Sequence, residues 1–216
     1  MILYTYWMSS CSWRVRMALA WKRLEAEQRP VDLTKEEQRR AEFATVSPQQ
    51  QVPVLLDGDV SISQSMAILE YLEDAYPARP LLPAEPGRRA LVRQICEMIV
   101  SGIQPLQHRR LLGRLEELGG PAERRRWAHD AIATGLAALE PLLAASAGTC
   151  CVGDTVTLAD CCLVPQVYNA RHRFGVDVSR FPTVCRVTAA LEARPEFAET
   201  HPHRQPDCPP AQRDAV

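Results

Sequence analysis

A proline-rich stretch divides the chain into two parts with different hydrophobic patterns. Residues 77–86 contain four prolines, and proline lacks an amide hydrogen and fixes its own φ, so it interrupts helices and strands alike. Strand-length apolar runs alternate with helical patterns before this stretch, whereas only long helical patterns follow it. The chain has 216 residues, enough for each part to bury its own core. We therefore expect two domains, residues 1–80 and 87–216, joined by a stiff linker.

The first part predicts the element order strand, helix, strand, helix, strand, strand, helix. The turn signal Asp57-Gly58 separates the last two strands, and a serine cluster at residues 9–12 begins the first helix. This order is typical of a thioredoxin-like α/β domain, in which a parallel pair and an antiparallel hairpin share one sheet. The expected strands cover 2–6, 30–33, 52–56 and 60–62, and the expected later helices cover 35–44 and 64–76.

The second part predicts an all-α domain, because Ala and Leu are abundant and the apolar residues recur at helical spacing. Glycines punctuate the pattern, most clearly at Gly119-Gly120-Pro121. The tail at 202–216 has four further prolines and no periodicity, so we expect it to be extended or partly disordered. The expected helices cover 88–118, 122–147, 158–173 and 183–193.

Charge and cysteine usage exclude several classes of partner. The formal net charge of −1 is unlike that of nucleic-acid or anionic-membrane binders, so we expect small molecules or a second copy as partners. No signal peptide and no apolar run of about 18 residues is present, which predicts a cytoplasmic protein without a membrane span. Eight cysteines occur without a CxxC pair or a metal-ligand spacing, so we expect free thiols and no metal.

The serine cluster before the first helix carries the clearest chemical signal. Backbone N–H groups at a helix start are unsatisfied and, with the helix dipole, favour an anion such as a thiolate. An external thiol with a pKa near 8.5 needs roughly 2.7 kcal/mol of stabilisation to be lowered by about two units. One hydroxyl donor contributes roughly 1.5–3 kcal/mol and the dipole roughly 0.3–1. Ser9, or failing that Ser10, would donate, with Cys11 beside the sulfur. A plain N-cap role for the serines is the alternative.

Two further segments extend this signal. Pro53 opens a strand, and a cis Val52–Pro53 bond would turn the Val52 backbone toward a bound peptide, which could pair with it like an added strand; a trans edge proline is the alternative. Gln64 and Ser65 begin the next helix and could hold a carboxylate, or simply cap the helix. A thiol site, a backbone-pairing site and a carboxylate site match the three parts of glutathione.

With these residues in place, the chain resembles the zeta-class glutathione transferases, the family that includes the maleylacetoacetate isomerases. The likeness extends over nearly the whole chain. Its Ser-Ser-Cys segment is specific to the class, whereas the Thr157 to Asp160 capping box is shared by glutathione transferases at large. The segments that carry it are Ser9-Ser10-Cys11-Ser12-Trp13-Arg14-Val15-Arg16, Gln51-Val52-Pro53, Gln64-Ser65, Leu81-Leu82-Pro83, Ile103-Gln104-Pro105-Leu106-Gln107, Val152-Gly153-Asp154, Leu163-Val164-Pro165-Gln166-Val167 and Arg204-Gln205-Pro206-Asp207.

The resemblance implies the glutathione-transferase fold and a glutathione-dependent cis–trans isomerisation of maleylacetoacetate to fumarylacetoacetate, in aromatic amino-acid breakdown. Glutathione would act as a cofactor, because thiolate addition, bond rotation and elimination regenerate it. The substrate would be a small dicarboxylic acid. The resemblance also implies a homodimer, in which the first domain of one subunit meets the second domain of the other.

The resemblance further implies roles for individual residues. Ser9, Ser10 and Cys11 are the expected catalytic residues, and a guanidinium suits substrate carboxylates, which favours Arg173 and then Arg110. Met8 stands where relatives often carry Arg, and one extra residue between Ala170 and Phe174 leaves open whether Arg171 or Arg173 faces the site. The expected glutathione-binding residues are Ser9, Ser10, Cys11, Ser12, Trp13, Arg14, Gln38, Val52, Gln64, Ser65 and Gln107.

Other functions remain compatible with the same residues. Maleylpyruvate isomerases resemble this family and differ mainly in how the substrate carboxylates are held. A transferase or dehalogenase acting on small α-halo acids would use the same thiolate but consume glutathione. A non-catalytic binding protein with this fold is a further alternative, since fold does not fix function. A redox role is disfavoured, because Arg14 stands where a CxxC pair with Cys11 would need its second cysteine.

Overall fold

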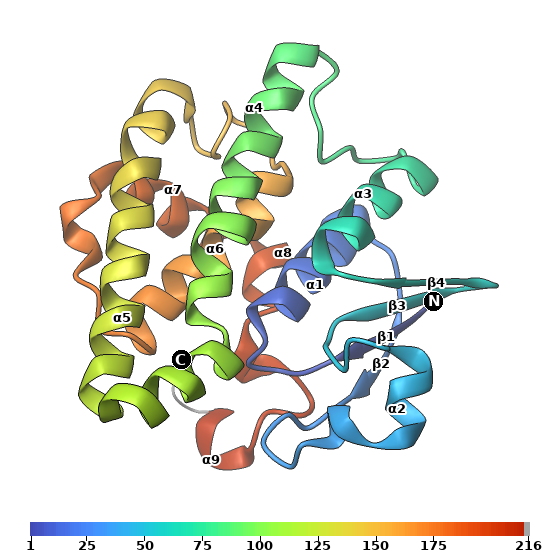
Figure 1. Ribbon diagram of the computed structural model, residues 1–216. Coiled ribbons are helices and arrows are strands. Elements are labelled where there is room, and N and C mark those ends of the chain that lie inside the picture. The colour runs from blue at the N-terminus through green and yellow to red at the C-terminus, as the bar shows by residue number, and fades with distance from the viewer. Residues whose placement is uncertain (214–216) are drawn as a thin grey trace. The chain divides into compact units, whose positions relative to one another are not determined.

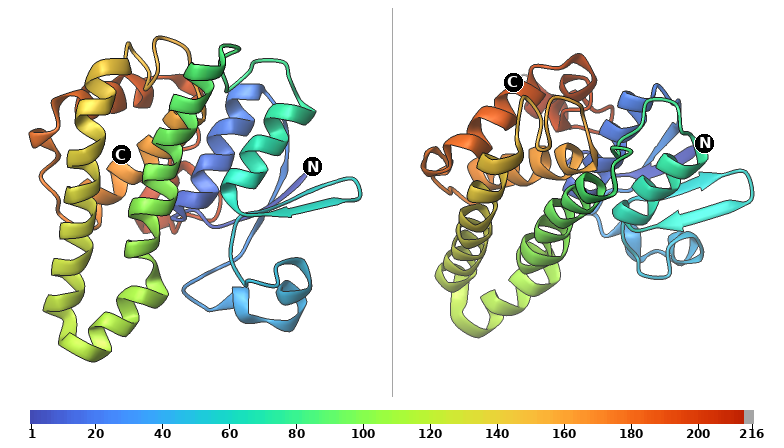
Figure 2. Two further views of the ribbon diagram at one scale, coloured as in Figure 1. Left: turned by 45° about the horizontal axis from the view of Figure 1, so that its top comes forward. Right: turned by 90° about the horizontal axis from the view of Figure 1, so that it is seen from above.

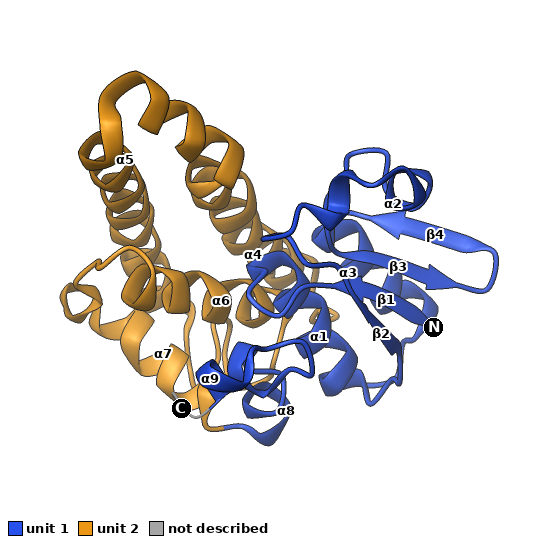
Figure 3. Ribbon diagram, turned by 90° about the horizontal axis from the view of Figure 1, so that it is seen from below, with its two compact units in different colours: residues 1–81, 194–216 blue, residues 82–193 orange. Residues whose placement is uncertain are grey.

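The structure is a computed structural model that describes residues 1–213 and divides them into two compact units (Figure 3). Unit 1 contains Met1–Leu81 and the C-terminal segment from Arg194, and unit 2 contains Leu82–Ala193. The sequence expectation placed residues 87–216 in the second domain. The C-terminal segment instead groups with the first unit, because the side chains of Trp7 and Trp13 contact it.

Unit 1 is built on a four-stranded sheet with the order β2-β1-β3-β4 (Figure 1). Strand β1 pairs parallel with β2 and antiparallel with β3, and β3 forms a hairpin with β4. This is the mixed sheet expected of a thioredoxin-like domain. The elements up to Leu81 are β1 (Ile2–Thr5), α1 (Ser10–Lys22), β2 (Glu27–Pro30), the 3-10 helix η1 (Glu37–Arg39), α2 (Ala41–Val46), β3 (Val54–Asp57), β4 (Val60–Ser63) and α3 (Ser65–Ala75).

Apolar residues cover both faces of the sheet. Leu3 points to one face, where α1 and α3 pack against each other with Leu19 and Ile68 buried. Tyr4 points to the other face and meets the ring of Phe43 from α2 edge-on, with the centroids 5.7 Å apart. The alternation of Leu3 and Tyr4 is the two-residue period of a strand. Because α1 follows β1 after a short turn, its start lies at the end of the sheet where β1 ends.

Two expected elements of unit 1 differ in position. The second strand covers Glu27–Pro30, whereas we expected residues 30–33. All four of its residues are exposed, since it is an edge strand, so it lacks the apolar alternation that marks a strand in sequence. The helix expected over 35–44 is divided into η1 and α2 by Arg40, whose backbone is extended with φ −66° and ψ 146°.

The C-terminal segment is also more ordered than expected. It contains the short helix α8 (Pro195–Ala198), the 3-10 helix η5 (Pro202–Arg204) and α9 (Pro210–Arg213). Its proline-rich sequence shows no periodicity. The segment is held instead by contacts with residues far away in the sequence, and sequence patterns do not report such contacts. Residues 214–216 of the expected tail lie outside the described residues.

Unit 2 is helical, as expected. The π-helical turn at Met98–Ile103 and Pro105 interrupt the helix expected over 88–118. Helix α5 (Arg109–Ser146) kinks at Gly120, where φ is 79°, so the expected break between 118 and 122 is confirmed. Both views in Figure 2 show the chain passing down α4 (Pro86–Glu97), turning at this kink and returning along the rest of α5. The elements are α4 (Pro86–Glu97), η2 (Met98–Ile103, π), η3 (Gln104–Gln107), α5 (Arg109–Ser146), α6 (Leu158–His172), η4 (Val178–Arg180) and α7 (Pro182–Glu192).

Helix α6 forms the centre of unit 2, because every residue from Leu158 to Ala170 is buried. A helix that is buried all round has no polar face, which explains its weak amphipathic pattern. All eight cysteines of the chain are free thiols, as expected. Across residues 1–213, none of the helices has the length and apolar character needed to cross a membrane.

Candidate functional site

The first helix begins with a serine cap. The backbone of Ser9 is extended, with φ −74° and ψ 115°, and its Oγ accepts the N–H of Ser12 at 3.2 Å. The N-cap interpretation of Ser9 is therefore correct, but it does not exclude a role at a sulfur. The cap uses the hydroxyl oxygen as an acceptor, and the hydroxyl hydrogen can still be donated to a second partner. The first turn of α1 contains no acidic residue, so its positive dipole end is not neutralised from within the helix.

Cys11 and Arg14 lie one turn apart on α1. The Cys11 thiol is half-buried, and Nη1 of Arg14 approaches its Sγ at 3.7 Å. The same Nη1 donates to Oγ of Ser65 at 3.2 Å, although Ser65 begins a different helix, α3. Arg14 therefore brings together the expected sulfur site and the expected carboxylate site.

The guanidinium of Arg14 is unusual in its surroundings. Arg14 has no exposed surface, and its Nε and Nη2 are buried without a hydrogen-bond partner among residues 1–213. Its hydrogen bonds go to the Ser65 hydroxyl and the Cys11 sulfur rather than to a carboxylate. A buried cation in this situation favours a nearby anion, because burial weakens its solvation. This fits the negatively charged ends of glutathione.

Two other residues of the first turn have structural partners. The Ser12 Oγ accepts the N–H of Tyr6 at 3.4 Å. The indole of Trp13 donates to Thr200 Oγ1 at 3.0 Å, and its ring meets His201 edge-on. Both side chains are therefore buried within unit 1 and bonded to groups of that unit. Their roles in glutathione binding remain predictions.

The start of α3 is the second part of the candidate site. Gln64 is its N-cap residue, but its side chain caps nothing and instead donates to Oε1 of Gln49. Its backbone has φ 75°, a region that non-glycine residues rarely adopt outside sites held by their surroundings. No acidic residue lies in the first turn, so the N–H groups of α3 can meet a carboxylate beside Ser65.

The strand-opening segment and Gln38 complete the predicted residues of unit 1. The Val52–Pro53 peptide bond is cis, the first of the two alternatives. Val52 is buried and precedes Val54, the first residue that pairs in β3, so the Val52 backbone lies outside the ladder. Gln38 is half-buried in η1, and its Oε1 is buried with no hydrogen-bond partner among the described residues.

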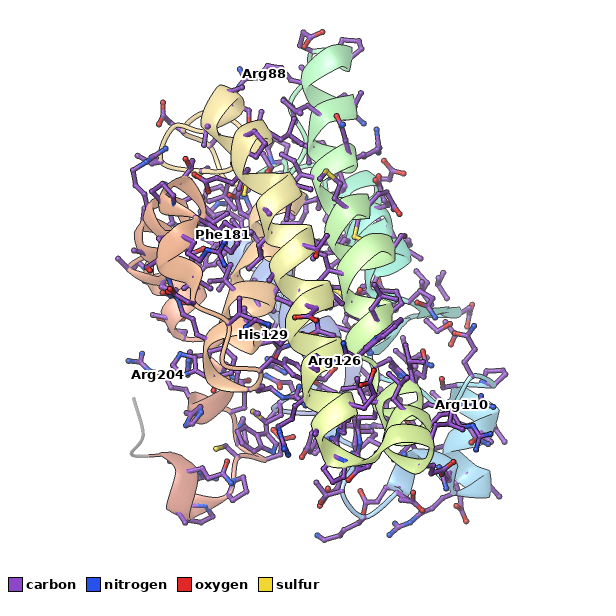
Figure 4. All side chains as sticks on the ribbon, turned by 60° about the vertical axis from the view of Figure 1, so that its left-hand side comes forward. Arg88, Arg110, Arg126, His129, Phe181 and Arg204 are labelled. Atoms are coloured by element: carbon purple, nitrogen blue, oxygen red, sulfur yellow. The ribbon has the colours of Figure 1, made fainter. Side chains whose placement is uncertain are left out.

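The remaining predicted residues lie in unit 2. Gln107 is buried, and its Nε2 donates to Oε1 of Gln166 at 2.6 Å. The other two amide atoms of this pair, Gln107 Oε1 and Gln166 Nε2, are buried without a partner within the described part of the chain. We did not predict Gln166; a polar residue inside the apolar run of α6 was the available signal. Arg110 is exposed near the start of α5 (Figure 4).

The two arginines at the end of α6 differ in their partners. Arg171 lies 3.8 Å from Glu192 and donates to Sγ of Cys185, so it already has a carboxylate partner. Arg173 is exposed, and its Nη1 donates to Oδ1 of Asn169 at 3.5 Å. Within residues 1–213, no group of three or more His, Cys, Asp and Glu side chains is arranged to hold a metal ion.

Comparison with known proteins assigns the family. The model described as "Glutathione S-transferase, N-terminal domain" matches residues 1–74, and "Glutathione S-transferase, C-terminal domain" matches residues 119–195. The chain belongs to the glutathione S-transferase family. This transferase is 48% identical over 210 residues to maleylacetoacetate isomerase of Rattus norvegicus, covering 96% of the chain and 95% of the relative. It is 48% identical over 212 residues to probable maleylacetoacetate isomerase 2 of Drosophila melanogaster, covering 97% and 91%.

Solved structures give the same family. The maleylacetoacetate isomerase from Anaeromyxobacter dehalogenans 2CP-1, with bound GSH in its active site, has a TM-score of 0.88 at 48% identity and covers 96% of this transferase and 97% of its own chain. A bacterial maleyl pyruvate isomerase of the zeta class has a TM-score of 0.93 at 40% identity, covering 97% and 100%. Both the class and the expected fold are confirmed, because these matches extend over both units.

Proposed function

We propose that this transferase is a glutathione-dependent isomerase that converts maleylacetoacetate to fumarylacetoacetate. The observation that carries the proposal is the start of α1, whose first turn contains no acidic residue. The half-buried Cys11 thiol lies there beside Arg14, a buried guanidinium with two nitrogen atoms that have no hydrogen-bond partner among residues 1–213. The support from relatives is the 48% identity to a maleylacetoacetate isomerase across 96% of the chain. In this proposal, bound glutathione supplies a thiolate that adds to the cis double bond and is eliminated after rotation.

The protein's first task is to keep the cofactor sulfur ionised. The Ser9 or Ser10 hydroxyl donates to it, and the unoccupied N–H groups of α1 add the helix dipole. A hydrogen bond to a charged sulfur contributes roughly 1.5–3 kcal/mol and the dipole roughly 0.3–1. Together these lower the thiol pKa by about two units, which requires roughly 2.7 kcal/mol. Cys11 lies beside the sulfur as a weak donor.

The second task is to hold the rest of the tripeptide. The N–H groups at the start of α3, with Gln64 and the Ser65 hydroxyl, bind the γ-glutamyl carboxylate, and Arg14 provides the charge behind Ser65. The Val52 backbone pairs with the cysteinyl backbone. Gln38 and Gln107 each carry a buried amide oxygen without a partner in the described chain, which suits an N–H donor of the tripeptide.

The third task is to orient the dicarboxylic substrate and stabilise the enolate that develops during rotation. We assign its carboxylates to Arg173 and, second, to Arg110, since a guanidinium binds two oxygens at once. Arg171 is the weaker candidate because its charge is already opposed by Glu192. Substitution of Arg173 by Met is expected to raise the KM for substrate and leave the KM for glutathione unchanged.

The deciding experiment follows maleylacetoacetate isomerisation with and without glutathione. We expect turnover only when glutathione is present, with the glutathione concentration constant throughout. Turnover without glutathione would contradict the cofactor assignment. Loss of glutathione in proportion to product would instead indicate a conjugating or dehalogenating transferase, because conjugation consumes the thiol.

Maleylpyruvate is the second candidate substrate. The observation in its favour is the TM-score of 0.93 to a zeta-class maleyl pyruvate isomerase. The two maleyl acids should be compared in parallel through their kcat/KM values. We expect maleylacetoacetate to be preferred, and a higher kcat/KM for maleylpyruvate would reverse the assignment.

We also propose that the protein acts as a cytoplasmic homodimer in tyrosine and phenylalanine breakdown. Eight free thiols favour a reducing compartment. Sedimentation tests the oligomeric state directly, and a single species near the monomer mass of 24.2 kDa would exclude the dimer.

A further inference from the structure

The turn that precedes Ser9 is held by charged side chains from two distant parts of unit 1. This turn, residues 6–9, connects β1 to α1 and is closed by a hydrogen bond from the Ser9 N–H to the Tyr6 carbonyl at 3.0 Å. Its conformation sets where Ser9 enters the helix, and so where the Ser9 hydroxyl points. Backbone N–H and C=O groups of the turn that are buried need hydrogen-bond partners, and these partners hold the turn in one conformation.

Arg16 supplies the donors for this turn. The residue is 3% exposed, and its Nη1 donates to the Tyr6 carbonyl at 3.3 Å and to Thr5 Oγ1 at 3.0 Å. Its Nη2 donates to the Trp7 carbonyl at 3.0 Å. Burial lowers the pKa of Arg16 to about 10, and the negative charge of Asp207 opposes this shift. Arg16 therefore stays protonated at neutral pH and holds the Tyr6 and Trp7 carbonyls of the turn.

Asp207 supplies the acceptor. Its Oδ2 accepts the Trp7 N–H at 2.8 Å, across 200 positions of sequence. Trp7 is 5% exposed, and its ring meets the ring of His203 edge-on with the centroids 5.8 Å apart. The titratable and charged groups around the turn thus come from α1 (Arg16), from η5 (His203) and from the segment after it (Asp207).

The segment that carries Asp207 is itself firmly attached. The buried Gln205 donates through Nε2 to the Glu199 and His201 carbonyls at 3.2 and 3.0 Å. Arg213 donates to the carbonyls of Pro206 and Cys208 on either side of Asp207. The carboxylate is therefore presented to Trp7 from a fixed backbone, although its sequence pattern predicted an extended tail.

We propose that Asp207 is a positioning residue for thiolate activation. By accepting the Trp7 N–H and facing Arg16, it holds the turn at residues 6–9 so that the Ser9 hydroxyl meets the cofactor sulfur at the start of α1. The inference rests on the proposed function, in which Ser9 or its neighbour donates to that sulfur. A displacement of about 1 Å at a reacting group can cost about a hundredfold in rate, so an anchor two residues from Ser9 is near enough to matter.

The test compares Asp207→Ala with Asp207→Asn. Alanine removes both the acceptor and the charge that faces Arg16, whereas asparagine keeps an acceptor oxygen and removes only the charge. The primary measurement is the pKa of enzyme-bound glutathione, from the ultraviolet absorbance of its thiolate as a function of pH. We expect Asp207→Ala to raise this pKa by about one unit, from about 6.5 to about 7.5, which lowers the ionised fraction and kcat at neutral pH about threefold, and Asp207→Asn to have a smaller effect. The loss should diminish at alkaline pH, where the thiol ionises without help.

Arg204→Ala is the matched control, because Arg204 is exposed in the same segment. It should leave the bound-thiol pKa unchanged. Thermal melting establishes that each variant is folded, and if Asp207→Ala does not fold, the asparagine variant decides. A folded Asp207→Ala, or in its absence a folded Asp207→Asn, with the wild-type bound-thiol pKa would overturn the proposal. If the unchanged protein neither binds glutathione nor lowers its thiol pKa, the proposed function fails instead, and the two failures are distinguishable.

Discussion

Helices α1 and α6 both begin with a hydroxyl residue, yet their first turns are completed differently. In α6, the Asp160 carboxylate accepts the Thr157 N–H at 2.7 Å, the Thr157 hydroxyl at 2.8 Å and the Cys151 N–H at 2.7 Å. Thr157 caps the N–H of Asp160 in return, and both residues are buried. This helix start therefore supplies its own carboxylate acceptor within the first turn.

The start of α1 lacks such an internal anion. Ser9 caps one N–H, and no acidic residue lies in the first turn. The comparison teaches that a cap residue alone does not separate a structural helix start from a binding one. What separates them is whether the first turn contains a carboxylate of its own, since that carboxylate would repel the thiolate that the site has to stabilise.

The largest expected effect is on stability, at α6. Asp160→Ala removes an acceptor from three buried donors, and we expect the free energy of unfolding to fall by about 2–5 kcal/mol. Denaturant unfolding followed by circular dichroism measures it. Asp177→Ala is the control, because Asp177 caps the exposed start of η4, where the loss should be smaller. Equal loss of unfolding free energy in both variants would show that the buried Asp160 carboxylate contributes no more than an exposed cap.

The next effect is on activity, at α1. Ser9→Ala removes the proposed donor to the sulfur, and we expect kcat/KM at neutral pH to fall by roughly 4- to 25-fold through a raised bound-thiol pKa. Loss of the cap to Ser12 should cost about 1 kcal/mol of stability. Ser10→Ala is the matched variant and resolves which serine donates. If Ser10→Ala shows the larger loss of activity, the donor is Ser10 and Ser9 is only a cap.

A third prediction converts α1 toward the α6 arrangement. Cys11→Asp places a carboxylate in the first turn, which should stabilise the helix by roughly 0.3–1 kcal/mol and raise the bound-thiol pKa. Cys11→Asn has nearly the same shape without the charge, so the difference between the two variants isolates the electrostatic effect. We measure glutathione affinity and thiolate absorbance for both. Equal thiolate ionisation in the two variants would refute the argument drawn from the missing internal anion.

The smallest effect concerns α5, whose start is capped by a side chain that titrates. The ring Nδ1 of His108 accepts the Arg110 N–H at 3.4 Å, which only the neutral imidazole can do. Burial, and then the charges of Arg109 and Arg110, lower the pKa of His108 below its ordinary 6.5. The unfolded chain thus binds more protons than the folded protein as the pH falls below about 6.5. The stability contributed by the His108 cap is therefore fully present above about pH 6.5 and is lost on acidification.

The expected loss at His108 is below about 1 kcal/mol, the size of a typical cap. Comparing unfolding free energies of the wild type and His108→Asn across the weakly acidic range measures it. The difference between the two proteins should depend on pH, because asparagine does not titrate. A constant difference would mean that the cap does not depend on the protonation of His108.

Local patterns predicted much of the fold and part of the site. The serine cap of α1 and the capping box of α6 are set by residues within one helical turn, so both were readable in sequence. The edge strand β2 was misplaced because its four residues are all exposed and show no alternation. The break at Arg40 was also missed, since it depends on backbone dihedrals rather than on hydrophobic spacing.

The sequence by itself determined the order of the elements, the change from a mixed α/β part to a helical part, and which helix starts carry polar side chains. Tertiary structure alone decided that Arg14 reaches Ser65, 51 positions away, and that Asp207 reaches Trp7, 200 positions away. The physical reason is range. Hydrophobic periodicity and capping act over a few residues, whereas a buried guanidinium or carboxylate takes whatever partner the packed chain brings within about 3 Å.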